Sequence, residues 1–280
     1  MTSAVELTLI APEWARSLPP TRYAEPEITV ARLYWETAPA SDFDSLVKLV
    51  PDESLNSPRR SVVPLLDFCR VRNEALARLD AVVNPNLGDA TDMIFEHAVP
   101  VQQGRGKPSF TDLLILTPVA VVAVEAKYTE PEYESVKSWL GEGQPNRHDV
   151  LQGWLNLLAN ALGRPIAEAE VQNLPYQLIH RAASACHIER SERAMIYLVF
   201  ESAAPHYATH IDALATILRN CVSLSVVSCP VVKSKAYEEL EQRWDAGERR
   251  MAPTVRSALM AAPLFTFGRL NNETPSRRSA

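Results

Sequence analysis

The chain has 280 residues, a hydrophobic content of 46%, 22% charged residues and a formal net charge of −6. These values are typical of a globular protein with a substantial core, and no apolar run approaches the roughly 18–20 residues that span a bilayer. The N-terminus has no basic segment followed by an apolar stretch, and the cysteines lie far apart. We therefore predict a cytoplasmic protein that does not contact membranes, with buried free thiols at Cys69, Cys186, Cys221 and Cys229.

Proline-rich sequence without sustained periodicity fills residues 1–64. Within it, residues 28–36 fit a strand or a short helix, and residues 42–50 fit a helix. We expect 1–64 to be an N-terminal extension that packs on a core domain formed by residues 65–262. The last ten residues, 271–280, are polar and are predicted to be a disordered tail.

Two elements are predicted at the start of the core. Apolar residues at helical spacing indicate one helix over 65–83, in which Glu74 lies away from the apolar stripe. Residues 93–101 fit a strand, and Glu96 falls on a face that is otherwise apolar, where a buried carboxylate needs a partner. The other face of this strand is expected to carry Met93, Phe95, His97 and Val99.

A β-hairpin is predicted next, because two short apolar strands, 111–116 and 119–126, are joined by Thr117-Pro118. Pro118 suits the second position of a type I turn, since its ring fixes φ near the required value. A turn centred there sets the register of the strands. The expected pairs are Leu116–Val121, Leu114–Ala123 and Asp112–Glu125.

Charged side chains gather on one face of this hairpin. Alternation along the strands places Asp112, Glu125 and Lys127 together, with opposed residues roughly 4.5–5.5 Å apart at Cβ. Two carboxylates at that distance repel each other unless a positive charge lies between them. A divalent metal ion is the natural occupant, and Lys127 adds a second positive charge.

The hairpin contains Asp112, then a gap of twelve residues, then Glu125-Ala126-Lys127. This pattern resembles the motif of the PD-(D/E)xK nuclease superfamily, whose fold is that of restriction endonucleases. Pro108 stands four residues before Asp112, so the literal "PD" pair is missing. The resemblance implies that Asp112 and Glu125 bind Mg²⁺ or Mn²⁺ and that Lys127 helps to activate water. It also implies a nucleic-acid substrate, DNA foremost, and allows a homodimer. The carbonyl of Ala126 is a further candidate ligand.

Helices are predicted after the hairpin, over residues 131–140 and 147–162, with Asn146 as a cap of the second. Members of the superfamily often place a polar residue, frequently Gln, on the helix that follows the ExK motif. By this resemblance Gln152 is a candidate near the metal or its water, and Glu96 or Glu74 is a candidate third acidic ligand.

A strand–helix–strand order follows further along, in residues 193–201, 206–220 and 222–232, and it is typical of a parallel crossover. An amphipathic helix is predicted over 234–250. The elements together predict an α/β fold, a restriction-endonuclease-like mixed sheet flanked by helices, with an antiparallel hairpin that carries the charges.

The net charge is negative, so the chain lacks the overall positive charge that is typical of proteins that bind nucleic acid. The segment 102–109 lacks the GxxxxGK[ST] spacing of a phosphate-binding loop and is expected to be a turn. Local basic patches remain as candidates for contact with a phosphate backbone. They are Arg59-Arg60, Arg70 with Arg72, Arg105 with Lys107, and Arg147-His148.

The sequence favours a divalent-metal-dependent nuclease over three alternatives. One is a nuclease fold without catalysis that serves as a nucleic-acid-binding or interaction module. Another is a metal-dependent hydrolase with a different substrate. In the third, Asp112, Glu125 and Lys127 are ordinary strand ends. The sequence leaves open DNA or RNA, interior or terminal cleavage, and the oligomeric state.

Overall fold

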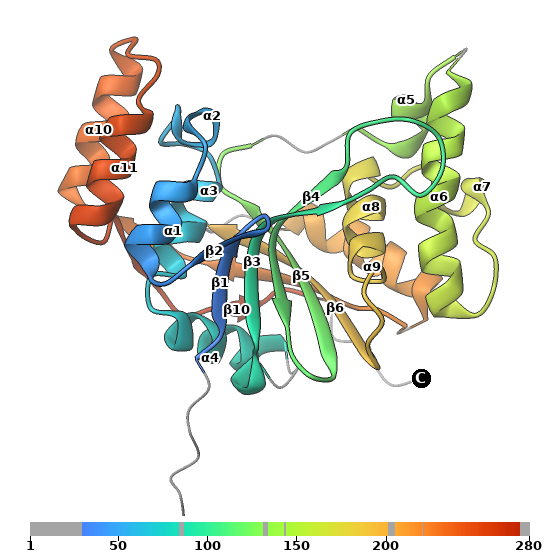
Figure 1. The fold of residues 1–280 in the computed structure, drawn as a ribbon. Helices are drawn as coiled ribbons and strands as arrows, with labels where there is room; N and C mark the ends of the chain where they lie inside the picture. The colour runs from blue at the N-terminus through green and yellow to red at the C-terminus, as the bar shows by residue number, and fades with distance from the viewer. Residues whose placement is uncertain are drawn as a thin grey trace, which may run out of the picture.

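A mixed eight-stranded sheet forms the centre of the protein in the computed structural model (Figure 1). Its strand order is β10-β7-β6-β5-β4-β3-β1-β2, and β5, β6 and β7 are parallel to one another. The strands are β1 (Arg32–Trp35), β2 (Ala38–Ala40), β3 (Asp92–Val99), β4 (Ser109–Leu116), β5 (Ala120–Lys127), β6 (Glu192–Phe200), β7 (Ser223–Cys229) and β10 (Asn271–Asn272). The structure describes residues 30–83, 87–130, 134–142, 144–200, 205–219 and 221–274.

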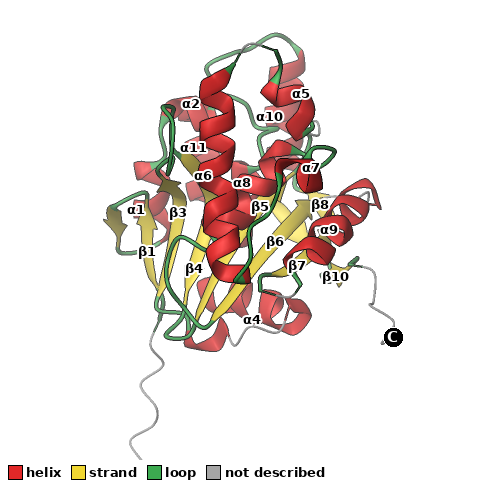
Figure 2. Cartoon of the chain, turned by 90° about the vertical axis from the view of Figure 1, so that its right-hand side faces the viewer, coloured by secondary structure: helices red, strands yellow, loops and turns green. Residues whose placement is uncertain are grey.

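Helices cover both faces of this sheet, so the fold is the predicted mixed α/β sandwich (Figures 1 and 2). One face is covered by α1 (Phe43–Leu49), α2 (Asp52–Leu55), α3 (Val62–Phe68), α4 (Arg72–Val83), α10 (Lys235–Asp245) and α11 (Ala252–Ala261). The other is covered by α5 (Val136–Leu140), α6 (Pro145–Leu162), α7 (Glu168–Val171), α8 (Tyr176–Ser184) and α9 (Pro205–Leu218). No helix of the described residues is long and apolar enough to cross a bilayer.

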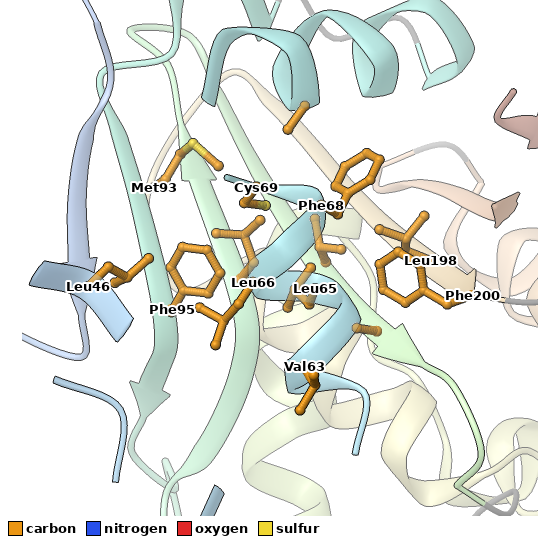
Figure 3. Close-up of a cluster of buried hydrophobic side chains, with 14 of the residues drawn as sticks. Leu46, Val63, Leu65, Leu66, Phe68, Cys69, Met93, Phe95, Leu198 and Phe200 are labelled. Carbon is orange, nitrogen blue, oxygen red and sulfur yellow. The ribbon is translucent and has the colours of Figure 1, made fainter. Parts of the chain in front are cut away.

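Two hydrophobic clusters hold these layers together, one on each face of the sheet. Figure 3 shows the first, in which Leu65 and Leu66 of α3 lie against Phe95 of β3 and Phe200 of β6. All four are essentially inaccessible to water. Complete burial of a Leu or Phe side chain contributes roughly 1.5–3 kcal/mol, so α3 is fixed firmly on the sheet.

The predicted extension is part of the same sheet where the structure describes it. Strand β1 pairs in parallel with β3, and β2 pairs with β1. The tail is described as far as residue 274, and its first two residues pair with β7 as β10. This pairing corrects the expectation of disorder at residues 271–272.

The predicted helix over 65–83 is wrong, because the chain breaks it into α3 and α4 after Phe68. Asp67 is buried, and its carboxylate accepts hydrogen bonds from the backbone N–H groups of Leu264 and Phe265 and from the Arg70 guanidinium. The turn at Cys69 brings Arg70 back to this carboxylate. A partly buried ion pair thus lies at the break between the two helices.

The predicted strand over 222–232 is also divided, at Pro230, into β7 and β8 (Val231–Lys233). Proline has no N–H for a sheet ladder, and the Pro230 carbonyl accepts a hydrogen bond from Gly268. Strand β8 pairs with β9 (Phe265–Phe267) in a separate two-stranded sheet. The parallel crossover β6–α9–β7 is formed as predicted.

All four cysteines are free thiols, as predicted. Cys69 and Cys229 are buried as predicted, whereas Cys186 and Cys221 are only half-buried, which corrects the prediction for these two. Burial raises the pKa of each thiol, which disfavours the reactive thiolate form.

Candidate functional site

The hairpin β4–β5 places the predicted charges at one end of the sheet. Its turn is closed by a 3.0 Å hydrogen bond from Thr117 N to Ala120 O, and the Thr117 hydroxyl accepts from the next two backbone N–H groups. The register pairs Leu116 with Val121 and Leu114 with Ala123, as the turn residues predict.

From the turn, the ladder between β4 and β5 extends to the pair Leu113–Val124 and does not include Asp112. Instead of joining the predicted backbone pair with Glu125, Asp112 accepts a 2.8 Å hydrogen bond from Ala126 N through Oδ2. The side chain therefore takes the place of a backbone partner. Asp112 is fixed on the face that carries Glu125 and Lys127, while Ala126 contributes its N–H.

Glu125 is the most enclosed charge of the site, with 2% of its surface exposed. Its Oε1 accepts hydrogen bonds from Lys127 Nζ at 2.8 Å and from Gln177 Nε2 at 2.5 Å. Its Oε2 accepts from Arg181 Nε. A buried carboxylate with three donors, two of them cationic, is fully compensated and held in one position.

Helix α8 supplies two of these donors, and sequence reasoning missed it. Gln177 and Arg181 are four residues apart, so they lie on one face of the helix, turned toward β4 and β5. Gln177 also accepts a 2.8 Å hydrogen bond from Lys127 Nζ. The available signal was a pair of long polar side chains at helical spacing within an otherwise buried segment.

Glu96 joins the site through an unusual backbone conformation. Its φ of +51° lies in the left-handed region, which costs a non-glycine residue about 1–3 kcal/mol. At this point the β3–β4 ladder is interrupted, between the pairs Phe95–Leu113 and His97–Thr111. The side chains change face here, because Phe95 packs in the α3 cluster and Val99 in the opposite one. The predicted common face of Phe95 and Val99 is therefore wrong.

These residues line a cavity of about 780 Å³, which we call the acidic cavity. Strands β3, β4 and β5 contribute Glu96, Asp112, Glu125 and Lys127, and α8 contributes Gln177 and Arg181. The segment 53–65 forms another wall, so the predicted extension helps to build the site. The remaining lining residues are Glu53, Ser54, Arg60, Ser61, Val62, Leu65, Lys107, Phe110 and Glu130.

Two carboxyl groups in the acidic cavity have perturbed proton affinity. Burial, and then repulsion from Glu125, raise the pKa of Asp112 well above its usual range. Burial raises the pKa of Glu96 to about 7, with Glu125 adding repulsion and Arg181 opposing the shift. Both groups lack sufficient positive charge nearby, and a bound cation would lower both pKa values.

A divalent ion fits part of this arrangement. Asp112 Oδ1 and the Glu96 carboxylate have no hydrogen-bond partner among the described residues, so they are available as ligands. Glu125 is engaged by three protein donors, with Arg181 on Oε2, and has one acceptor site left. In keeping with this, no three Asp, Glu, His or Cys side chains in the described ranges are gathered closely enough to hold a metal as they stand.

Other predicted site residues lie elsewhere. Gln152 is exposed on α6, donates a 2.9 Å hydrogen bond to Asn156 and does not line the acidic cavity, so the structure does not bring it to Asp112, Glu125 and Lys127. Gln177 on α8 contacts Glu125 and Lys127 instead. Glu74 is exposed on α4 and does not line the acidic cavity. Asn146 does not cap α6, which begins at Pro145.

The fold and the site define a mixed α/β protein with a buried charge cluster at one end of its sheet. The chain belongs to the family described as "Domain of unknown function (DUF6946)", which matches residues 39–237. This range contains every strand and helix that lines the acidic cavity. No curated protein and no solved structure matches the chain. Its function must therefore be inferred from the chemistry of the acidic cavity.

Proposed function

We propose that the chain is a divalent-metal-dependent nuclease with a restriction-endonuclease-like fold, which hydrolyses phosphodiester bonds of nucleic acid, DNA foremost. The observation that carries the proposal is the convergence of Glu96, Asp112, Glu125 and Lys127 in one cavity, with the pKa of Glu96 and of Asp112 raised. Carboxylates short of positive charge form the ligand set that Mg²⁺ or Mn²⁺ prefers.

Each side chain has a distinct role in this proposal. Asp112 and Glu96 would hold the ion, and Glu125 would join them when Arg181 releases it. The ion would lower the pKa of a bound water and offset negative charge on the phosphate. Lys127, held by Glu125 and Gln177, is a preorganised positive charge for the pentacovalent phosphate.

A specific observation also favours a second candidate, a non-catalytic module that keeps the fold. Both oxygens of Glu125 are occupied by protein donors, which is the pattern of a structural ion-pair network. In this case Lys127 and Arg181 serve stability, and the protein binds its partner without cleaving it.

Metal binding and cleavage separate the two candidates. We would titrate the protein with Mg²⁺ and Mn²⁺ by calorimetry and incubate it with mixed DNA and RNA substrates. Asp112→Asn is the sharpest variant, because asparagine can still accept the Ala126 N–H but has lost its charge. Lys127→Met is the second variant. Glu74→Ala and Gln152→Ala are matched controls, since both residues are exposed and lie outside the cavity.

For a nuclease we expect metal-dependent cleavage by the wild type and both controls. Asp112→Asn should reduce cleavage at least about a hundredfold, since it removes both a ligand and a preorganised charge. Metal binding without cleavage would locate an ion site whose substrate is not nucleic acid. Absence of both would favour the non-catalytic module.

A further inference from the structure

A second cavity, of about 450 Å³, adjoins the acidic cavity. The two share three lining residues, Lys107, Phe110 and Arg181. The second cavity lies between the loop 101–110, the start of α6 and helix α8. Its volume falls within the roughly 300–1,000 Å³ of pockets that hold small molecules or single nucleotides.

The charge of this second cavity is entirely positive. Arg105, Lys107, Arg147 and Arg181 line it, and its lining contains no aspartate or glutamate. We therefore call it the basic cavity. Arg105 and Lys107 are exposed, and no carboxylate in the described part of the chain pairs with either of them or with Arg147. Cations that are not paired with a carboxylate are available to an anionic ligand.

The loop that carries Arg105 is fixed on α6. Asn146 accepts a 2.7 Å hydrogen bond from Arg105 N and donates one of 2.7 Å to Arg105 O. Gly153 allows the loop to approach closely, because a Cβ at this position would lie 2.8 Å from Gln103 N. The loop turns at Gly104, whose φ is +73°. The basic side chains thus emerge from a preorganised backbone.

Aromatic side chains form the other wall of the basic cavity. The rings of Trp139 and Tyr176 are stacked with centroids 3.7 Å apart, and Trp154 donates a 3.0 Å hydrogen bond to the Tyr176 hydroxyl. The Arg147 guanidinium lies 5.5 Å from the Trp139 ring centroid and donates to the Trp139 carbonyl. A rigid aromatic wall beside basic side chains is the combination that binds single-stranded nucleic acid.

A chain of hydrogen bonds links the two cavities. Arg181 bonds to Glu125 through Nε and donates a 2.8 Å hydrogen bond from Nη1 to the Ser109 hydroxyl. The same hydroxyl forms a 2.8 Å hydrogen bond with His180 Nδ1. The lowered pKa of His180 keeps this ring neutral. An anion near Arg181 in the basic cavity would compete with Glu125 for the same guanidinium.

We propose that the basic cavity binds the phosphate backbone and a base of a single nucleic-acid strand that leads into the acidic cavity. This inference rests on the proposed nuclease function and names its substrate class, a single strand or the unpaired end of a duplex. Arg105 and Lys107 contact phosphates, and the wall of Trp139 and Tyr176 contacts a base.

Binding can be measured without metal, which separates this proposal from catalysis. We would follow the anisotropy of fluorescent single-stranded oligonucleotides, DNA and RNA, in EDTA and at several salt concentrations, with duplex and inorganic phosphate as competitors. The test variant is Arg105→Gln/Lys107→Gln, since both side chains are exposed and their loss leaves the buried network intact. The control is Lys48→Gln/Arg269→Gln, two exposed cations outside both cavities with the same change in charge.

We expect the test variant to bind roughly tenfold more weakly, and its slope of log affinity against log salt to fall by about 1.4, or about 0.7 for each phosphate contact. The control should bind like the wild type. Equal binding by the two variants, preference for duplex, full displacement by millimolar inorganic phosphate, or no oligonucleotide binding would each overturn the proposal. Binding without cleavage in Mg²⁺ would support it while contradicting the nuclease. Unchanged cleavage by the test variant would support the nuclease and contradict the proposed role of the basic cavity.

Discussion

The acidic and basic cavities adjoin each other, but their charges are neutralised in different ways. In the acidic cavity Glu125, Lys127 and Arg181 are each at most 8% exposed, and they satisfy one another. In the basic cavity Arg105 and Lys107 are exposed to water and salt. Removing a buried charge leaves its partner uncompensated, whereas an exposed charge is screened by solvent.

In the proposed function this difference gives the two cavities separate tasks. The buried network fixes Glu125 and Lys127 in position, which is the preorganisation that a catalytic charge would need. The exposed cations would raise the local concentration of an anionic partner near the acidic cavity. Arg181 lines both cavities and would take part in both tasks.

The largest effect is expected for the variant Arg181→Met, which tests the buried network. It leaves the Glu125 charge buried with only Lys127 and Gln177, and removal of one partner from a buried ion pair costs about 3–5 kcal/mol. We expect the free energy of unfolding, measured by urea denaturation at pH 7, to fall by about 3 kcal/mol or more.

Two variants control for this experiment. Glu125→Gln in the Arg181→Met background removes the unpaired charge and should restore part of the stability. Arg164→Met breaks a 3.0 Å pair with Glu170 whose side chains are about a third exposed, and the loss should stay below about 1 kcal/mol. If Arg181→Met and Arg164→Met lowered the free energy of unfolding equally, the assignment of a buried network around Glu125 would be contradicted.

The pH dependence of stability tests the acidic cavity alone. Because the pKa of Glu96 rises from 4.5 to about 7 on folding, the folded state holds more protons than the unfolded state between these values. Stability from this group is therefore present below pH 4.5 and is lost as the pH rises through about 7. At pH 8, Glu96→Gln should be more stable than the wild type by on the order of 2–3 kcal/mol.

Urea denaturation from pH 5 to 8 gives the measurement, and the difference between the two proteins isolates Glu96 from the other groups of the chain. The control variant Glu74→Gln, at an exposed residue, should have the same free energy of unfolding as the wild type at every pH. Saturating Mg²⁺ at pH 8 should stabilise the wild type more than Glu96→Gln, because the ion offsets the repulsion among the carboxylates. An unchanged pH profile in Glu96→Gln would contradict the raised pKa.

Local sequence predicted the hairpin well. Pro118 sets the turn, and alternation of apolar residues places Asp112, Glu125 and Lys127 on one face, so neighbours in sequence decide the register. The crossover β6–α9–β7 was predictable for the same reason, since a strand, a helix and a strand follow one another within a short segment.

The rest of the site depends on distant contacts. Gln177 and Arg181 lie 52 and 56 residues after Glu125, and no periodicity shows which helix will cover the hairpin. The resemblance favoured the first long helix after the motif, hence Gln152, but α6 turns that side chain to solvent. The left-handed backbone at Glu96 also had no signal, because it arises where the β3–β4 ladder is interrupted.

The smallest effect is expected for the preorganisation of the basic cavity, tested by Gly153→Ala against Gly163→Ala. Alanine at 153 gains about 1 kcal/mol in helix propensity, but its Cβ would lie 2.8 Å from Gln103 N, and overpacking costs about 1–3 kcal/mol. We expect a net loss of about 1 kcal/mol. The loop must move away from α6, which displaces Arg105 and weakens single-strand binding.

Gly163 is the matched comparison, because it ends the same helix in open space with a φ of +76°. Alanine there is strained by about 1 kcal/mol but displaces nothing. The two variants should lose similar stability in urea, and only Gly153→Ala should bind the oligonucleotide more weakly, by roughly twofold to fivefold if one of the phosphate contacts is lost. Unchanged binding in both would mean that the exposed cations reach the strand from a mobile loop. In that case the two cavities would differ in charge and exposure but not in preorganisation.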